Sequence, residues 1–285
     1  MNPPAAAASG GGKMPASVDL PHTGIEATSV VADKRLIRMR FEQAAATYEQ
    51  QAQVQLLVAD RLLDLLHATI PSPPSGRILE IGCCTGLLTE KIIDRFPGLT
   101  HLTASDLVDS FAHCVAQKTK HLAHKVLFLA GDIETVSLPG RYDLIISSST
   151  LQWVHDLPRL CRKLARHLNP GGAMAVALYG RENMREIRAV TGVGLRYMNL
   201  EQLIAVVQKD FQILAAKQSL ETLWFQDAIS VLKHLRATGV NSIGQRPWTR
   251  RQLNIFLNDY RERFSGPRGV QLTYHPMYAI ARPRP

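Results

Sequence analysis

The sequence has few cysteines and aromatic residues, and it has no long apolar segment. Its 285 residues include 4 cysteines and 6% aromatic residues. Cys83, Cys84, Cys114 and Cys161 show neither C-x-x-C spacing nor the spacing of a disulfide framework, so we expect reduced thiols and a cytoplasmic protein. No apolar run approaches the roughly 20 residues that span a bilayer, so we expect no membrane partner.

Metal-ligand patterns are also missing, whereas positive charge is in excess. The 10 histidines are scattered, and none stands with a cysteine or an acid at the spacing of a metal site, so we predict no metal. The formal net charge is +9 and the isoelectric point is about 9.6. This charge favours an acidic protein, a nucleic acid or an anionic substrate as partner, but an ordinary basic protein would have it too.

The first part of the chain divides into a tail and a helical leader. Residues 1–28 are rich in Ala, Pro, Gly and Ser, which predicts a disordered tail, and they lack the apolar core of a signal peptide. Residues 29–75 have apolar side chains at helical spacing until a proline cluster ends the pattern. We expect this leader to cover a binding site. Its Tyr48 is either a site residue or an aromatic on a buried helix face.

The stretch RILEIGCCTG, residues 77–86, predicts a buried strand, a tight glycine turn and a helix to about Arg95. Gly82 and Gly86 suit a turn that needs positive φ or close approach to a ligand. No lysine follows the last glycine, so the turn is not a P-loop, and the glycine spacing differs from G-x-G-x-x-G. The turn is therefore the first crevice of another kind of doubly wound α/β domain.

Strands and helices then alternate, which predicts a parallel sheet with its ligand at the carboxyl ends of the strands. Three of these ends carry acids, Glu80, Asp106 and Asp132. Asp106 is placed to accept hydrogen bonds from ribose hydroxyls and Asp132 from an exocyclic amine, with Leu107 and Ile133 on either side of a base. Any single one of these acids is explained equally well as a helix cap. The expected strands are 77–81, 100–105, 125–130, 142–147 and 173–179.

The glycine turn and the three acids resemble the motifs of class I S-adenosylmethionine-dependent methyltransferases. Glu80 to Gly86 is similar to E-x-G-x-G-x-G, except that Cys84 stands at the middle glycine, and Asn169-Pro170-Gly171-Gly172 also resembles the family. The resemblance implies a Rossmann-like core over 76–180 that binds S-adenosylmethionine. The implied cofactor-binding residues are Glu80, Gly82, Cys84, Gly86, Asp106, Leu107, Asp132, Ile133 and Ser147.

Residues 181–285 are expected to hold cap helices and the closing strands. Strands at 211–223 and 270–282 would complete a seven-stranded, mostly parallel sheet whose last strand is antiparallel. The segment between them predicts a helical insert that caps the acceptor site. The expected helices are 182–189, 200–209, 227–238 and 249–264.

Four further stretches are similar to the malonyl-[acyl-carrier protein] O-methyltransferases of biotin synthesis: RFEQAAATYEQQAQVQ, SSSTLQWVHDL, HLRATGVN and LTYHPMYAIA. The resemblance implies methyl transfer to the free carboxylate of a malonyl thioester on acyl carrier protein, which primes pimeloyl synthesis. A carboxylate is already ionised at pH 7, so no strong general base is required. The candidates for holding it are Tyr48, Gln152, Arg236, Tyr274 and His275.

Acyl carrier proteins are acidic, so the arginines of the insert are expected to meet one: Arg236, Arg246, Arg250, Arg251, Arg261, Arg263 and Arg268. Other functions stay open. A class I enzyme acting on a small free acid or a quinone precursor is the nearest. A nucleic-acid methyltransferase is disfavoured, because Ser147 to Thr150 replace an N/D-P-P-Y motif. A non-enzymatic assembly factor is favoured only by Cys84.

Overall fold

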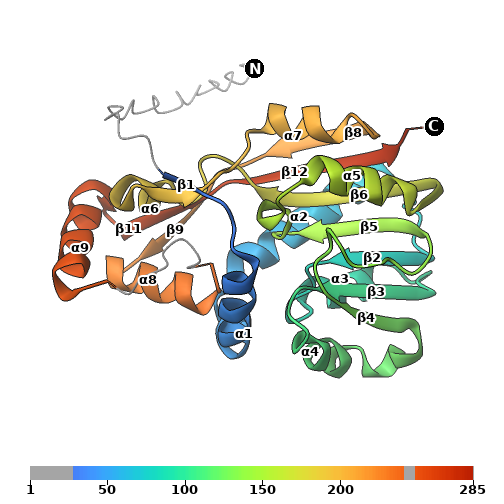
Figure 1. Cartoon of the computed structure of the whole chain (residues 1–285), viewed down its shortest axis with the longest axis horizontal. Helices are drawn as coiled ribbons and strands as arrows, with labels where there is room; N and C mark the ends of the chain where they lie inside the picture. The colour runs from blue at the N-terminus through green and yellow to red at the C-terminus, as the bar shows by residue number, and fades with distance from the viewer. Residues whose placement is uncertain (1–27, 241–247, 285) are drawn as a thin grey trace, which may run out of the picture.

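The computed structural model describes residues 28–240 and 248–284, and Figure 1 shows its arrangement. The predicted disordered tail, 1–28, lies outside the described residues except for Thr28, and so does Arg246. Within the described residues no helix is long and apolar enough to cross a membrane.

A seven-stranded sheet forms the centre, in the order β4-β3-β2-β5-β6-β12-β8. β12 runs antiparallel to both its neighbours, β6 and β8, and the pairings among β4, β3, β2, β5 and β6 are parallel. The predicted sheet is therefore confirmed. The strands are β2 (Arg77–Ile81), β3 (His101–Asp106), β4 (Val126–Ala130), β5 (Tyr142–Ser148), β6 (Leu168–Tyr179), β8 (Phe211–Gln218) and β12 (Pro276–Pro283).

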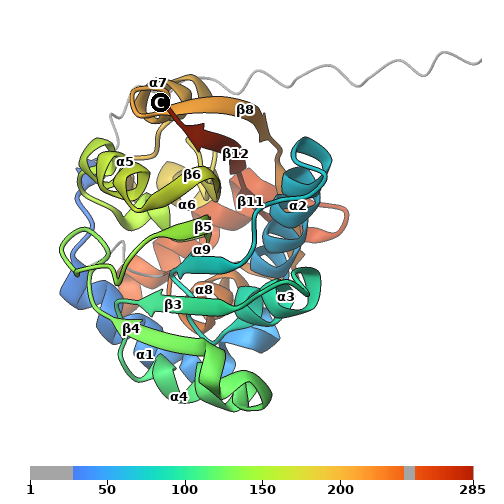
Figure 2. The ribbon, with the colours of Figure 1, turned by 90° about the vertical axis from the view of Figure 1, so that its right-hand side faces the viewer.

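Helices cover both faces of this sheet (Figures 1 and 2). Because successive strand residues point to opposite faces, Ile78 packs in one core with α2 and α3, and Leu79 packs in another with α5 and α7. Strands covered on both faces are mostly apolar, as β2 is at Ile78, Leu79 and Ile81. The helices are α2 (Gln53–Thr69), α3 (Leu87–Arg95), α4 (Phe111–Lys118), α5 (Leu157–Arg166) and α7 (Leu200–Val207), with short 3-10 turns at Lys120–Lys125 and Leu151–Trp153.

The predicted leader forms two helices, α1 (Lys34–Gln51) and α2. The Asp33 side chain caps α1 by accepting from the backbone N–H groups of Arg35 and Leu36, at 2.9 and 3.3 Å. α2 packs on the sheet, whereas α1 contacts α8 (Ala228–Ala237) of the later part of the chain. The hydroxyl of Thr47 donates to the carbonyl oxygen of Ala237 at 3.1 Å, which joins the two helices.

Two predicted strands are wrong, because each is split between the central sheet and a second sheet. The expected strand 211–223 is β8 followed by β9 (Glu221–Phe225), and the expected strand 270–282 is β11 (Gly269–Tyr274) followed by β12. β9 and β11 pair with each other and, with β10 (Ser265–Gly266), form a three-stranded antiparallel sheet. Only residues 219–220 separate β8 from β9, and only His275 separates β11 from β12, so each pair resembles one continuous strand in the sequence.

The later part of the chain completes the cap with α6 (Arg185–Thr191), α8 and α9 (Arg250–Phe264). Glu186 of α6 is fully buried and joins this helix to β11. Its carboxylate accepts from the backbone N–H and the hydroxyl of Thr273, at 2.9 and 2.5 Å. A parallel pair of short strands, β1 (Thr28–Val30) and β7 (Val193–Leu195), was not predicted. The division at residues 75 and 180 stays a prediction.

Candidate active site

The glycine turn after β2 adopts positive φ angles at three positions, 76° at Gly82, 49° at Cys84 and 91° at Gly86. Glycine is required at the first, because a Cβ at Gly82 would lie 2.0 Å from the hydroxyl oxygen of Thr150. The backbone N–H of Gly82 donates to the carbonyl oxygen of Ser105 at 2.7 Å. The turn is thus fixed between the ends of β3 and β5, with its backbone exposed to a pocket.

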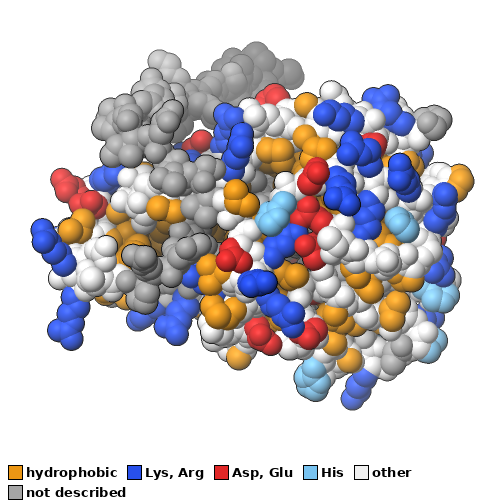
Figure 3. All heavy atoms as spheres, in the orientation of Figure 1, with side chains coloured by type: hydrophobic (Ala, Val, Ile, Leu, Met, Phe, Trp, Pro, Cys, Tyr) orange, Lys and Arg blue, Asp and Glu red, His pale blue; other side chains and the backbone are white. Residues whose placement is uncertain are grey.

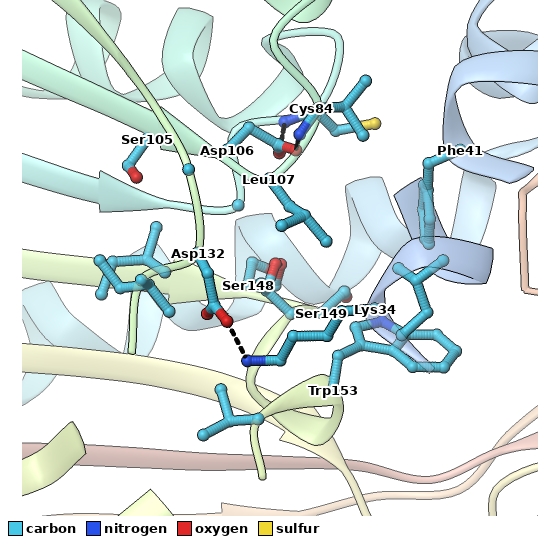
Figure 4. A pocket seen from close by; sticks show the side chains of 18 of the residues that line it. Lys34, Phe41, Cys84, Ser105, Asp106, Leu107, Asp132, Ser148, Ser149 and Trp153 are labelled. Atoms are coloured by element: carbon cyan, nitrogen blue, oxygen red, sulfur yellow. Dashed lines mark hydrogen bonds and ion pairs between the residues drawn. The ribbon is translucent and has the colours of Figure 1, made fainter. Parts of the chain in front are cut away.

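Cys84 is the unusual residue of this turn. A non-glycine residue in the left-handed region costs about 1–2 kcal/mol. Its backbone N–H donates to Asp106 Oδ2 at 2.8 Å, and its thiol faces the hydroxyl of Tyr48 on α1. In Figure 4 the Cys84 sulfur points away from Asp106. Burial raises the pKa of this thiol well above its ordinary value, so it is a neutral group and not a thiolate.

Asp106 ends β3 and lines the same pocket. One carboxylate oxygen accepts from Cys84, and the other accepts from the backbone N–H of Val108 at 2.9 Å. Burial raises the pKa of Asp106 to about 6, although these hydrogen bonds oppose the shift. Each oxygen keeps a free lone pair, so the ionised carboxylate can still accept from two ligand hydroxyls.

Asp132, after β4, is joined to the leader by Lys34 at the start of α1. The Lys34 ammonium donates to Asp132 Oδ2 at 2.6 Å and also pairs with Glu134 (Figure 4). The other Asp132 oxygen accepts from the backbone N–H of Glu134 at 3.0 Å. His155 adds a second link to the leader through the carbonyl oxygen of Ala32, at 2.6 Å. These contacts hold the start of the leader beside the pocket, and its role as a lid stays a prediction.

The opposite wall of the pocket is apolar and aromatic. Phe41 of α1 has its ring centroid 6.3 Å from that of Tyr48 and 6.2 Å from that of Trp153. Ile37 and Val154 also line this wall. The pocket has an empty volume of about 750 Å³, part of it open to solvent, which is within the size range of small-molecule sites. A ligand here would lose much of its water.

Glu80 lies directly behind the turn and is fully buried. Its Oε2 accepts from the hydroxyl of Thr89 at 2.6 Å, while its Oε1 has no partner within the described residues. Burial raises the pKa of Glu80 to about 8, so the carboxyl holds a proton at neutral pH. The buried hydroxyl of Ser148, at the pocket wall, likewise lacks a partner in the described part of the chain. A ligand bound in the pocket would be placed to satisfy the Ser148 hydroxyl, whereas Glu80 is not among the residues that line the pocket.

The structure brings many of the predicted residues together around this pocket and places others outside its wall. Those that line it are Tyr48, Gly82, Cys84, Asp106, Leu107, Asp132 and Ile133. Gly86 instead begins α3, and Ser147 is buried in β5 with its hydroxyl donating to the carbonyl oxygen of Ile81 at 2.9 Å. Both support the turn from behind.

The acceptor candidates other than Tyr48 lie behind the wall. The Gln152 amide donates to the carbonyl oxygen of Ser149 at 2.7 Å, and its buried Oε1 has no partner among the described residues. Tyr274 is fully buried in β11, and its hydroxyl pairs with His234 at 2.7 Å. Arg236 is exposed on α8. The structure does not place these side chains in direct contact with the pocket.

Both ring nitrogens of His275 are engaged. Nδ1 accepts from the backbone N–H of Glu182 at 3.1 Å, and Nε2 lies 3.1 Å from Gln218 Oε1. Because Nδ1 accepts, we assign the proton to Nε2, which donates to Gln218. His275 thus fastens β12 to β8 and to the loop after β6.

Four residues near the site were not singled out by sequence reasoning: Lys34, Ser149, Tyr179 and His234. Ser149, also at positive φ, lines the pocket, and its hydroxyl pairs with that of Tyr179 at 3.0 Å. Burial lowers the pKa of His234 to about 4, so its imidazole is neutral. The position of Ser149 directly after a strand end is a sequence signal that could have identified it. The other three residues have no such signal, because they reach the site through tertiary contacts.

These residues fit a cofactor with a ribose, an amine-bearing base and a charged tail. Two carboxylates face the pocket at successive strand ends, apolar side chains flank them, and the backbone of the turn is accessible. The described residues contain no cluster of three or more side chains able to hold a metal ion.

Comparisons with known proteins agree with this arrangement. Residues 78–172 match the family model described as a methyltransferase domain. The chain is 38% identical over 258 residues to a malonyl-[acyl-carrier protein] O-methyltransferase of Chlorobium phaeovibrioides, covering 90% of this chain and 99% of that protein. The protein of that name from Haemophilus influenzae is 34% identical over 251 residues, covering 88% and 95%.

Among solved structures, the N-methyltransferase NodS of Bradyrhizobium japonicum, in complex with S-adenosyl-L-homocysteine, superposes with a TM-score of 0.55. The match covers 87% of this chain and 99% of that one at 17% identity, so it concerns the fold alone. The family is assigned from the two named relatives, because those matches cover most of each chain at 34% identity or more. The chain belongs to the malonyl-[acyl-carrier protein] O-methyltransferase family of S-adenosylmethionine-dependent methyltransferases.

Proposed function

We propose that this chain transfers the methyl group of S-adenosylmethionine to the free carboxylate of malonyl-acyl carrier protein. The product, a malonyl methyl ester, would prime pimeloyl synthesis in the biotin pathway. Relatives that match nearly the whole chain bear the name of this activity. The observation that carries the proposal is the pocket wall. We take Asp106 and Asp132 as its cofactor end and the aromatic side chains of Phe41 and Trp153 as its acceptor end.

The acceptor needs no base, because its carboxylate is ionised at neutral pH. S-adenosylmethionine, when bound, supplies an electrophilic methyl group on a positively charged sulfur. One carboxylate oxygen forms the new bond to the methyl carbon as the carbon–sulfur bond breaks, and the electron pair of that bond goes to sulfur. The protein has to orient the carboxylate and remove its water.

For orientation we propose hydrogen-bond donors on the wall next to the glycine turn. Tyr48 is buried, and burial raises the pKa of its hydroxyl well above the ordinary value, so it remains a donor at all physiological pH values. Ser149 and Gln152 lie on the segment after β5, with Gln152 placed one layer behind. Of the proposed acceptor-site residues, Tyr48 and Gln152 therefore lie nearest to the pocket.

We propose a role other than direct contact with the acceptor for Arg236, Tyr274 and His275. Tyr274 packs against Tyr179, with ring centroids 5.7 Å apart, and pairs with His234, while His275 joins β12 to its neighbours. Their contacts suit support of the cap behind the acceptor. Arg236 would reach an acceptor only with a movement of α8.

Water removal is assigned to the aromatic wall. Phe41 and Trp153 pack edge to face at an interplanar angle of 85° and close the side of the pocket opposite Asp132. A carboxylate between them and the methyl donor would lose hydration and become more nucleophilic. The leader supplies Phe41, so its attachment through Lys34 is part of the catalytic arrangement.

The acidity of the carrier complements the net charge of +9 of this chain. All four cysteines are free thiols, which supports action in a reducing compartment, the cytoplasm. A small free acid as substrate is the alternative that the pocket alone would equally accept.

The test is a transfer assay with labelled S-adenosylmethionine and four acceptors: malonyl-acyl carrier protein, malonyl-coenzyme A, free malonate and RNA. We expect rapid labelling of malonyl-acyl carrier protein, slower labelling of malonyl-coenzyme A and none of RNA. The labelled product should release methanol on mild alkaline hydrolysis, as an ester does. Efficient labelling of free malonate with none of the carrier-bound substrate would refute the proposal.

A further inference from the structure

The outer face of α5 carries three exposed arginines, Arg159, Arg162 and Arg166. Across the described residues, 28–240 and 248–284, the guanidinium groups of these three form no ion pair or hydrogen bond. Some other surface arginines are engaged, as Arg38 is with Asp109 at 2.6 Å, whereas the guanidinium groups of Arg250 and Arg251 on α9 also form no ion pair or hydrogen bond within the described residues. In Figure 3, Lys and Arg side chains gather at the upper right, where Figure 1 draws α5. The face is therefore a positive surface without an internal counter-charge.

A groove runs beside this face, between α5 and residues 134–138. The acid that lines it, Glu134, is already engaged with Lys34 and accepts from the backbone N–H groups of His155 and Asp156, at 3.0 and 2.8 Å. Lys163 crosses under the groove and donates to the carbonyl oxygen of Ile133 at 2.8 Å. The groove thus presents unneutralised positive charge along one side.

This face adjoins the pocket directly, whereas α9 of the arginine-rich insert contacts α8, which in turn packs on the pocket-lining helix α1. α5 begins at Leu157, directly after the segment 148–154 that walls the pocket, and Ile133, bound by Lys163, is itself a wall residue. Of the described residues, none after Val154 lines the pocket. α9, which carries Arg250 and Arg251, packs on α6, α8 and β11.

We infer that the acidic carrier protein docks on the α5 face, through Arg159, Arg162 and Arg166 and the adjoining groove, and not on the arginines of α9. The inference rests on the proposed function, which supplies the carrier as partner. Guanidinium groups pair well with exposed carboxylates, and such surface pairs mainly speed encounter. Docking next to the segment 148–154 would deliver the thioester to the acceptor end of the pocket.

The test uses two double charge reversals in the full chain. Arg159→Glu with Arg162→Glu alters the α5 face, and Arg250→Glu with Arg251→Glu is the matched control on α9. Both pairs lie on exposed helix surface, and Arg159 and both control positions lie in the first turn, where glutamate is favoured. Each variant is assayed with malonyl-acyl carrier protein and with malonyl-pantetheine, which has no carrier and no phosphate.

We expect the α5 variant to lose about tenfold in kcat/KM with malonyl-acyl carrier protein, because two contacts are replaced by repulsion. Its activity with malonyl-pantetheine should stay within twofold of wild type, and the α9 variant should resemble wild type with both. The wild-type rate with the carrier should also fall with salt, since the Debye length shortens from about 10 Å at 0.1 M to 3 Å at 1 M.

Three results would overturn the inference: no loss in the α5 variant, a larger loss in the α9 variant, or an equal loss with both substrates. The last would mean that α5 affects the chemistry and not the docking. If the wild-type protein failed to methylate malonyl-acyl carrier protein at all, the proposed function itself would be refuted, which is a separate result.

Discussion

Replacing Cys84 with glycine tests two properties of this residue separately: the free-energy cost of its left-handed backbone and the contribution of its thiol to turnover. Glycine would relieve the left-handed conformation, worth about 1–2 kcal/mol. Two effects oppose this gain. Glycine adds chain entropy to the unfolded state, worth about 0.4–1 kcal/mol, and the burial of the side-chain CH₂ group is lost, worth roughly 0.8 kcal/mol. The free energy of unfolding should therefore change by less than about 1 kcal/mol, which corresponds to a Tm shift below about 4 °C.

Turnover should respond differently from stability. The thiol faces the hydroxyl of Tyr48, and a single hydrogen bond contributes about 0.5–1.5 kcal/mol. If this contact orients Tyr48 toward the acceptor, Cys84→Gly should lower kcat about two- to fivefold. Affinity for S-adenosylmethionine should be kept or improved, since the turn approaches the cofactor more closely without a side chain.

The assays are thermal unfolding, calorimetric titration with S-adenosylmethionine and single-turnover methyl transfer. Cys84→Ala is the control, because it keeps the Cβ and its backbone cost but removes the sulfur. Its kcat should fall as much as that of the glycine variant. Its free energy of unfolding should be about 1 kcal/mol lower than that of the glycine variant. Cys84→Gly should have no further effect in a Tyr48→Phe background. An unchanged kcat in both variants, or additive losses in the double variant, would refute the reasoning.

Three other changes should act on separate parts of the pocket. Asp106→Ala should weaken S-adenosylmethionine binding by at least tenfold, because two hydrogen bonds to a charged acceptor, each worth about 1.5–3 kcal/mol, disappear; an unchanged Kd in a folded variant would remove Asp106 from the site. Cofactor affinity should fall as the pH drops below about 6, where the raised pKa of Asp106 leaves its carboxyl protonated and less able to accept from hydroxyls; a Kd that is flat between pH 5 and pH 7, measured by the same titration, would contradict this. Tyr48→Phe and Gln152→Ala should each lower kcat several-fold with cofactor affinity nearly unchanged, and wild-type kinetics with malonyl-acyl carrier protein in both would show that the acceptor lies elsewhere.

The sequence alone was sufficient for the cofactor half of the protein. Strand-end acids and a glycine turn are local features, because a parallel strand, its turn and the next helix are contiguous in the chain. Asp106, Asp132 and Gly82 could therefore be placed at one edge of a sheet before any coordinates were known, and the structure finds all three around one pocket. The parallel arrangement of β2 to β6 followed from the same alternation of elements.

Tertiary structure alone decided the acceptor half. The residues of this wall come from segments far apart in the chain, such as Phe41 with Trp153 and Ser149 with Tyr179. The changes of sheet at the ends of β8 and β11 were also not predicted, since the breaks between the successive strands are only one or two residues long. Local pattern fixes which face a residue takes within its element, but which elements meet depends on packing of the whole chain. That is why His275, expected at the acceptor, is found fastening β12 to β8 instead.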